Sequence, residues 1–147
     1  MSIQIRKVSS KKELKTFVRF ANRLYKGNKY YVPSMPMDDM NTFTPEKNGA
    51  FDFSEAELYL AYKGDEVVGR VAAIINHKAN EAWKVKQVRF GWIDFIDDLE
   101  VSKALLDAVV AFGKARGMEQ IVGPLGFTDF DPEGMLVEGF DRLSTMA

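Results

Sequence analysis

Four polar side chains that could bind a ligand follow one short apolar run near the end of the chain. Thr128, Asp129, Asp131 and Glu133 come directly after residues 118–122, a run typical of a strand. Ligands in α/β sheets usually bind just beyond the carboxyl end of a parallel strand, so these side chains are placed where a ligand would lie. Two alternatives stay open. In the first, the polar residues serve only to form turns in this glycine- and proline-rich loop. In the second, the acids bind a divalent ion, although the spacing of an EF-hand is absent.

Asp94, His77 and two tyrosines are the other polar side chains at strand positions. Asp94 alternates with Ile93 and Phe95, a pattern that an outward-facing polar residue would also produce. His77 ends a predicted strand, where a solvent-exposed histidine is the commoner outcome. Tyr59 and Tyr62 fall in another strand, and aromatic residues are favoured there without any chemical role.

Composition excludes several classes of site and of protein. The chain has no cysteine and one histidine, which excludes a thiolate nucleophile, a disulfide framework and a zinc site built on histidine pairs. No metal site is therefore predicted. A formal charge of −1 from 20 basic and 21 acidic residues argues against nucleic-acid binding. We read the lysines at 11, 12 and 15 as a solvated surface.

Length and hydropathy favour one domain over residues 1–147 that lies outside the membrane. A chain of 147 residues suits a single domain, and no apolar run approaches the roughly 20 residues that a spanning helix needs. The first residues lack the basic head and apolar stretch of a signal peptide. We therefore expect a cytoplasmic protein.

The order of predicted elements is strand, helix, irregular segment, three-stranded meander, helix and strand. Ser10 and Glu13 form a capping-box signature, and Gly27 follows the apolar face of that helix. Residues 28–48 are rich in proline, methionine and tyrosine, with at most a short helix at 38–42. Such a segment either lines a ligand cleft or simply covers the edge of a core.

The second half of the chain carries the clearest strand signals. Two strand-like runs flank Lys63-Gly64-Asp65, which predicts a β-hairpin, and Gly69 within the second run indicates a bulge or a close backbone approach. A third strand is expected at 88–96 and a helix at about 99–116. The final strand–helix–strand unit implies a parallel crossover. We therefore predict an α/β (α+β) fold with a mixed, mostly antiparallel central sheet flanked by helices.

This order of elements resembles the first two-thirds of the GNAT fold of acyl-CoA N-acyltransferases. The resemblance implies that the central strand, 90–96 here, splays from its parallel neighbour. Acyl-CoA then lies in the gap, with its pyrophosphate at the start of the following helix. Mapped by position, four residues would contact acetyl-CoA or another acyl-CoA: Phe95, Ile96, Leu99 and Ser102.

The predicted phosphate loop, 97–102, departs from the family pattern. It contains no glycine and three acids, Asp97, Asp98 and Glu100. Carboxylates repel a pyrophosphate, whereas acids at a helix start are ordinary caps and dipole partners. The family's reaction needs a base, often a carboxylate acting through water. The resemblance makes Asp94, Asp129 and Glu133 the candidate catalytic residues.

Five segments look like stretches of longer bacterial GNAT-like proteins of uncharacterised activity. They are residues 24–28, 31–33, 68–76, 123–129 and 133–141. In such proteins a second acyltransferase-like half follows. Residues 143–147 show no closing pair of strands, so we expect this sequence to be an N-terminal half. A short independent domain with an unusual C-terminus is the alternative.

Two functions follow from these observations. In one, the chain belongs to an N-acyltransferase that acts on a small-molecule or other amine substrate, and C-terminal sequence completes its site. In the other, it is a non-catalytic GNAT-like module that positions a substrate or forms a protein contact, with a homodimer possible.

Overall fold

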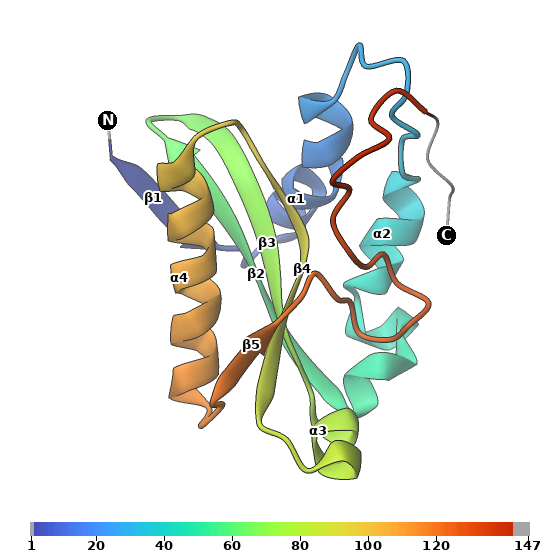
Figure 1. Ribbon diagram of the computed structural model, residues 1–147, viewed down its shortest axis with the longest axis vertical. Coiled ribbons are helices and arrows are strands. Elements are labelled where there is room, and N and C mark those ends of the chain that lie inside the picture. Colours follow the sequence, from blue (N-terminus) through green and yellow to red (C-terminus); the bar gives the residue numbers. More distant parts are fainter. Residues whose placement is uncertain (1, 143–147) are drawn as a thin grey trace.

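The computed structural model describes residues 2–142, which form one five-stranded sheet with the strand order β1-β2-β3-β4-β5 (Figure 1). The first four strands pair antiparallel and β4 pairs parallel with β5. The predicted mixed, mostly antiparallel sheet is confirmed. The strands are β1 (Ile3–Lys7), β2 (Ser54–Lys63), β3 (Glu66–Asn76), β4 (Gln87–Phe95) and β5 (Gln120–Val122).

Helices cover both faces of this sheet. Helix α4 packs along one face, and α1 and α2 lie on the other, so the molecule has three layers (Figure 1). The helices are α1 (Lys11–Leu24), α2 (Pro36–Thr42), α3 (His77–Trp83) and α4 (Leu99–Ala115), with two 3₁₀ turns, η1 (Pro45–Lys47) and η2 (Gly49–Asp52).

The start of α1 is fixed by the capping box read from the sequence. The Glu13 backbone N–H donates to the Ser10 hydroxyl oxygen, and that hydroxyl donates to the Glu13 carboxylate. The same carboxylate accepts a hydrogen bond from the Ser9 N–H. These bonds satisfy donors that a helix start otherwise leaves open.

Helix α4 lies close to the sheet because β3 has a glycine beneath it. A Cβ atom placed on Gly69 would lie 2.9 Å from side-chain carbons of both Val101 and Leu105. Gly69 is also next to a register shift, since Ala61 pairs with Gly69 but Tyr62 pairs with Val67. The bulge and the close approach predicted at Gly69 are therefore both present.

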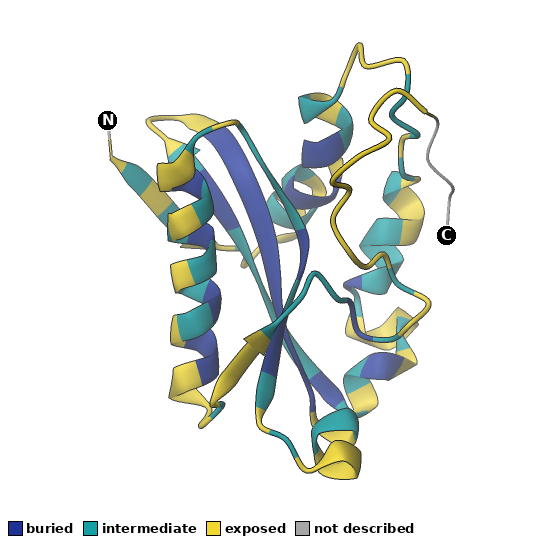
Figure 2. Ribbon diagram, viewed as in Figure 1, coloured by how far each residue is buried: buried dark blue, intermediate teal, exposed yellow. Residues whose placement is uncertain are grey.

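Two hydrophobic clusters lie on opposite faces of the sheet, and β3 contributes to both (Figure 2). The cluster beneath α1 and α2 includes Phe17, Phe43, Leu60, Trp92 and Phe127. The cluster beneath α4 includes Val71, Ile75, Val88, Leu105 and Val109. Because both faces of β3 are covered, every residue of that strand after Glu66 is buried.

Helix α3 was not anticipated. The segment after β3 lacks the apolar stripe that marks an amphipathic helix, so its pattern does not predict one. Its start is determined instead by Asn76, whose side-chain oxygen accepts a hydrogen bond from the Ala79 N–H. The predicted helices at 38–42 and 99–116 and the strand at 118–122 are present with ends shifted by one or two residues.

Candidate functional site

Strands β4 and β5 run together for only three residue pairs and then separate. The pairs join Gln87 to Gln120, Val88 to Ile121 and Arg89 to Val122. Further along, β4 contains a bulge, because Ala72 pairs with Gly91 whereas Arg70 pairs with Asp94. Trp92 in this bulge has φ of 46°, in the left-handed region that bulky residues rarely adopt. Such backbone outliers cluster at functional sites.

The segment after β5 fills the first part of the space beside β4. The Leu125 N–H donates to the Phe90 carbonyl at 2.9 Å. A Cβ on Gly91 would lie 2.3 Å from the Leu125 oxygen, so only glycine permits this approach. Among residues 2–142, no backbone hydrogen bond other than those to β3 engages β4 after Phe90. The gap next to β4 is therefore at its carboxyl end.

Arg89 and Asn76 hold the same segment from inside the protein. The Arg89 guanidinium is buried and donates to the Gly126 and Phe127 carbonyls at 3.1 and 3.3 Å. The Asn76 side-chain amide donates to the Phe127 carbonyl at 2.9 Å. These bonds place the Phe127 ring in the cluster beneath α2, where the side chain is fully buried.

Asp94 lies at the carboxyl end of β4, in a network with Arg70 and Tyr25. Its Oδ1 accepts a hydrogen bond from the Tyr25 hydroxyl at 2.8 Å. Its Oδ2 accepts one from Arg70 Nε at 3.0 Å and lies 2.9 Å from Arg70 Nη2 in an ion pair. Arg70 also donates to the Phe17 carbonyl and is only 5% exposed. Burial, reinforced by the Asp94 charge, raises the pKa of Tyr25 well above its usual range. Both oxygens of the Asp94 carboxylate are therefore occupied.

The acidic loop is organised by Asp131. Its Oδ2 accepts hydrogen bonds from the Phe127 N–H at 2.8 Å and the Thr128 N–H at 3.1 Å. Burial raises the pKa of Asp131, and these two bonds oppose that rise. The candidate bases Asp129 and Glu133 are both exposed. The turn-forming interpretation therefore accounts for Asp131.

The loop and Asp94 lie at different levels of the sheet. Asp94 is bound by Arg70, whereas the Phe127 carbonyl at the start of the loop is bound by Asn76. These two β3 residues are six positions apart, roughly 20 Å along a strand that rises about 3.4 Å per residue. No described hydrogen bond or ion pair joins Asp94 to Asp129 or Glu133 within residues 2–142.

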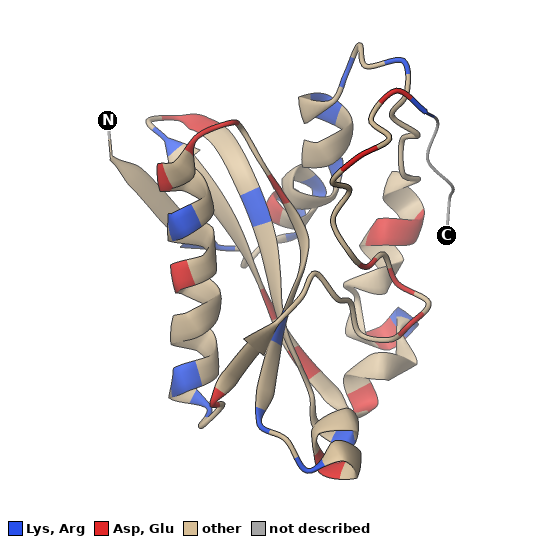
Figure 3. Cartoon of the chain, viewed as in Figure 1, with Lys and Arg blue, Asp and Glu red and all other residues tan. Residues whose placement is uncertain are grey.

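The start of α4, where the resemblance places a pyrophosphate, is capped by a carboxylate of the chain itself. The Asp98 side chain accepts a hydrogen bond from the Glu100 N–H at 2.9 Å, and its other oxygen lies 3.6 Å from Lys63 Nζ. Acidic residues gather at this turn (Figure 3). The residues present thus do not fit a pyrophosphate, because the Glu100 N–H is already occupied and the nearby acids repel an anion.

The four residues mapped to acyl-CoA surround this turn. Phe95 pairs with Gly69, and the Ile96 N–H donates to the Val68 carbonyl at 3.0 Å, so both extend the β3–β4 pairing. Leu99 is 87% exposed, and the Ser102 hydroxyl donates to the Leu99 carbonyl at 3.1 Å. Their assignment to acyl-CoA stays a prediction.

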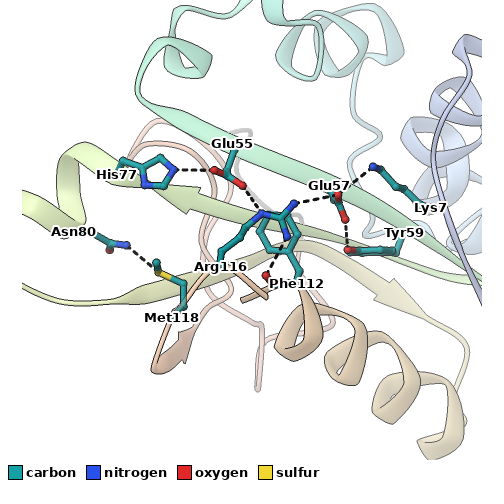
Figure 4. A network of polar contacts seen from close by, with 9 residues as sticks. All are labelled: Lys7, Glu55, Glu57, Tyr59, His77, Asn80, Phe112, Arg116 and Met118. Atoms are coloured by element: carbon teal, nitrogen blue, oxygen red, sulfur yellow. Dashed lines mark hydrogen bonds and ion pairs between the residues drawn. The ribbon is translucent and has the colours of Figure 1, made fainter. Parts of the chain in front are cut away.

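His77 and Tyr59 belong to a chain of ion pairs on the α4 side of β2, not to the β4–β5 gap (Figure 4). His77 Nε2 lies 2.9 Å from Glu55, Arg116 contacts both Glu55 and Glu57, and Glu57 lies 3.0 Å from Lys7 Nζ. The Tyr59 hydroxyl donates to Glu57. This arrangement fastens the end of α4 to β2.

The pKa values of both glutamates reflect this pairing. Burial acts to raise the pKa of Glu55, but hydrogen bonds from His77 and Arg116 outweigh it and lower that pKa. Burial likewise acts to raise the pKa of Glu57, but hydrogen bonds from Tyr59 and Lys7 outweigh it and lower that pKa. Both carboxylates are therefore stabilised as anions within ion pairs.

A groove of about 920 Å³ lies on the other side of the molecule, between α1, α2 and the β1–β2 edge. We call it the α1–α2 groove. Its floor is apolar and includes Leu14, Met37, Met40, Phe43, Phe51 and Leu58. Its rim carries five cations, Lys7, Lys11, Lys15, Arg19 and Lys47, and the carboxylate of Glu57.

Two features were sought in the described residues and not found. Among residues 2–142, no three acidic or histidine side chains come together as a metal site would require. Within the same residues no helix combines the length and the apolar character needed to cross a bilayer.

Comparison with known sequences finds two curated bacterial relatives. The chain is 32% identical over 137 residues to Protein YghO of Escherichia coli, and 32% identical over 135 residues to the bacterial ceramide synthase of Caulobacter vibrioides. These alignments cover 93% and 91% of the chain but only 35% of each relative. The chain thus spans about a third of the length of these relatives. It matches no protein-family model.

Comparison with solved structures identifies the fold. A tandem GNAT protein from the clavulanic acid biosynthesis pathway superposes with a TM-score of 0.58 at 11% identity, covering 80% of this chain and 34% of that one. A predicted acetyltransferase of Clostridium acetobutylicum, solved with acetyl-CoA, gives 0.57 at 14% identity and covers 82% and 79%. The chain has the fold of the GNAT acetyltransferases, as the order of its elements predicted.

Sequence reasoning did not identify Arg70 and Tyr25 as the partners of Asp94. One signal was available, because Arg70 is the single charge in the otherwise apolar run 67–75. A charge inside a buried strand requires a partner. Nothing local indicated which residues would supply it.

Proposed function

We propose that this chain is the GNAT-fold part of a protein that transfers an acyl group from acyl-CoA to an amine. The observation that carries the proposal is the separation of β4 from β5 after three residue pairs, next to the bulge at Trp92. That geometry opens a gap at the carboxyl end of a parallel strand, the usual ligand position in α/β sheets. Solved GNAT neighbours, one of them described with acetyl-CoA, support the same reaction class.

We further propose that sequence outside residues 1–147 completes the site and binds the pyrophosphate of acyl-CoA. The support is twofold. The start of α4 is capped by Asp98 and is acidic, so it is poorly suited to a phosphate. In addition, the chain spans 35% of the length of its curated relatives.

The acceptor class in this proposal is a long-chain amine. One relative is named as a ceramide synthase, and a ceramide is by definition the N-acyl product of a long-chain amino alcohol. Asp94, Asp129 and Glu133 remain the candidate bases. Of these, Asp129 and Glu133 are exposed, whereas the Asp94 carboxylate is already engaged by Arg70 and Tyr25.

A second function is favoured by one observation. If the acid-capped start of α4 excludes acyl-CoA altogether, the chain is a non-catalytic GNAT-like module that positions a substrate or contacts a catalytic partner. An exposed apolar stretch suits such a contact. It contains Phe130, Met135, Leu136, Val137 and Phe140, which are 59–99% exposed.

Calorimetry with acetyl-CoA, on residues 1–147 and on the full-length protein, separates the two functions. Acyl transfer predicts binding by the full-length protein and formation of an N-acyl amide from a long-chain amine. Absence of binding by both proteins contradicts acyl transfer. Micromolar binding by residues 1–147 alone contradicts the non-catalytic module and the need for outside sequence.

A further inference from the structure

The α1–α2 groove combines an apolar floor with a rim that is mostly cationic. Its volume of about 920 Å³ lies within the range of ligand sites, roughly 300–1,000 Å³. It is lined by α1, α2, η1, η2 and the β1–β2 edge, and by no residue of β4 or β5. Strand order places this edge opposite β5, so the groove is separate from the gap discussed above.

The cations of the rim are arranged in a row. Lys11, Lys15 and Arg19 are spaced four residues apart along α1, which puts them on one side of the helix. In the part of the chain that the structure describes, none of the three makes an ion pair, and neither does Lys47. Like charges at this spacing repel, so an anion placed beside them is favoured.

The carboxylate of the groove does not offset this charge. Glu57 lies 3.0 Å from Lys7 Nζ and 3.3 Å from Arg116, and it accepts a hydrogen bond from Tyr59. It is therefore already neutralised by its own partners. The net charge available to a ligand on the rim is positive.

The floor is suited to an alkyl chain. Met37 is 76% exposed at the groove, and Met40, Phe43 and Leu58 continue the apolar surface inward. Methionine is flexible and adapts to chains of different shape, and each buried methylene favours binding. By its sequence, the methionine-rich segment 28–48 either lines a ligand cleft or covers the edge of a core. The structure shows that it contributes side chains to this groove.

We propose that the α1–α2 groove binds a soluble amphiphile with one long alkyl chain and an anionic head group. The alkyl chain lies on the apolar floor, and the head group contacts the row formed by Lys11, Lys15 and Arg19. The proposal does not depend on acyl transfer, because it concerns a separate surface and is tested by binding alone.

Palmitate, kept below its critical micelle concentration, is the probe. Isothermal titration calorimetry on the intact protein is expected to show micromolar binding at one site. Hexadecyltrimethylammonium has the same alkyl length with a cationic head, and hexanoate has the head with a short chain. Each is expected to bind at least about tenfold more weakly than palmitate, because each lacks one of the two features.

Matched variants locate the site. Lys11→Glu/Lys15→Glu is expected to weaken palmitate binding about tenfold or more, whereas Lys12→Glu/Lys26→Glu, with the same charge change outside the groove, leaves it within about twofold. Met37→Asp should weaken binding and Met35→Asp should not, since both methionines are exposed but only Met37 lines the groove. Circular dichroism verifies that each variant is folded. If a charge variant does not fold, the comparison of Met37→Asp with Met35→Asp tests the proposal in its place.

Four results would overturn the proposal. The first is that palmitate does not bind, and the second is that the cationic amphiphile binds with the same affinity as palmitate. The third is that the groove variants and the control variants lose the same amount of palmitate affinity. The fourth is that the protein binds only to anionic phosphatidylglycerol vesicles. The last would indicate a membrane surface. A fifth contrary result is a dimer that depends on Lys11 and Lys15 and excludes palmitate, which would mean that a second copy of the chain occupies the groove.

Discussion

At the scale of single residues, the pair of Arg70 and Asp94 is the most consequential contact at the carboxyl end of β4. Arg70 is 5% exposed and uses three nitrogens, two on Asp94 and one on the Phe17 carbonyl. The bulge at Trp92 shifts the alternation of β4, so that Asp94 faces α1 rather than α4. Without this shift the buried guanidinium would have no counter-charge.

Replacing Asp94 with asparagine is therefore expected to destabilise the fold by about 3 kcal/mol, because it leaves a buried cation without its counter-charge. Tyr25→Phe removes one hydrogen bond and should cost about 1 kcal/mol. Urea unfolding measures both. Asp97→Asn, at an exposed acid three residues away, is the control and should change stability by less than about 0.5 kcal/mol. If Asp94→Asn leaves the free energy of unfolding unchanged, the carboxylate is not needed as the counter-charge of Arg70 and is free for another role.

At the scale of elements, the contact between α4 and β3 depends on one position without a side chain. Gly69→Ala would bring a methyl group within 2.9 Å of carbons of Val101 and Leu105. We expect a loss of about 1–3 kcal/mol from overpacking.

Gly49→Ala serves as its control, because nothing lies within 4 Å of the added carbon. Thermal melts of the two variants should differ clearly. The double variant Gly69→Ala/Val101→Ala tests the cause, since removing the opposing methyls should recover part of the loss. If it adds a further loss instead, steric contact with α4 is not the reason.

The ion pairs that join β2 to α4 should make stability depend on acidic pH. The folded-state pKa values of Glu55 and Glu57 are lowered from 4.5, so the unfolded chain binds more protons as the pH falls below that value. Their contribution is present above about pH 4.5 and is lost as pH falls through the folded pKa values. Because the pairs are partly exposed to solvent, which screens them, they contribute under about 1 kcal/mol each.

Glu55→Gln/Glu57→Gln should consequently be less stable than the parent protein at pH 7 and converge with it near pH 3. Chemical denaturation at several pH values measures this difference. Glu66→Gln/Glu81→Gln controls for the change in net charge. A gap between parent and variant that stays constant down to about pH 3 would argue against the ion pairs as its source.

At the scale of the whole molecule, the chain after β5 has two parts. Its first part, up to Asp131, is held by Arg89, Asn76 and internal bonds, and Phe127 is fully buried. Its second part, through Arg142, carries four of the exposed apolar residues, Met135, Leu136, Val137 and Phe140, and is exposed throughout. Only the first part is expected to contribute to the stability of this domain.

Two phenylalanines, one in each part, test this division. Phe127→Ala should cost about 3–5 kcal/mol, because it empties a space between Phe43, Phe51 and Trp92. Phe140, which is 63% exposed, should tolerate alanine within about 0.5 kcal/mol. Equilibrium unfolding of both variants gives the comparison. Comparable losses would mean that the second part packs on the domain after all.

The elements could be predicted where their signals are local. The capping box at Ser10 and Glu13, the hairpin at Gly64 and the close approach at Gly69 each depend on a few neighbouring residues, and each is present. The parallel crossover followed from the order of the elements. These signals were sufficient for the fold.

The site was less predictable because its contacts are distant in sequence. Asp94 is 24 residues from Arg70 and 69 from Tyr25. Gly91 adjoins the bulge at Trp92, but a glycine inside a strand indicates neither which residues bulge nor which side chains meet as a result. The α1–α2 groove depends on how α2 lies against α1 and the β1–β2 edge, a packing relation that no periodicity in the sequence expresses.

The buried position of Trp92 also provides an optical probe. The protein has two tryptophans, and the other, Trp83, is 67% exposed on α3 while Trp92 is 8% exposed. A Trp83→Phe variant would carry a single indole, whose ring centroid lies 4.7 Å from that of Phe43 on the groove floor. Its fluorescence would follow unfolding of the core, and an alkyl chain arriving against Phe43 would change the emission without any added label.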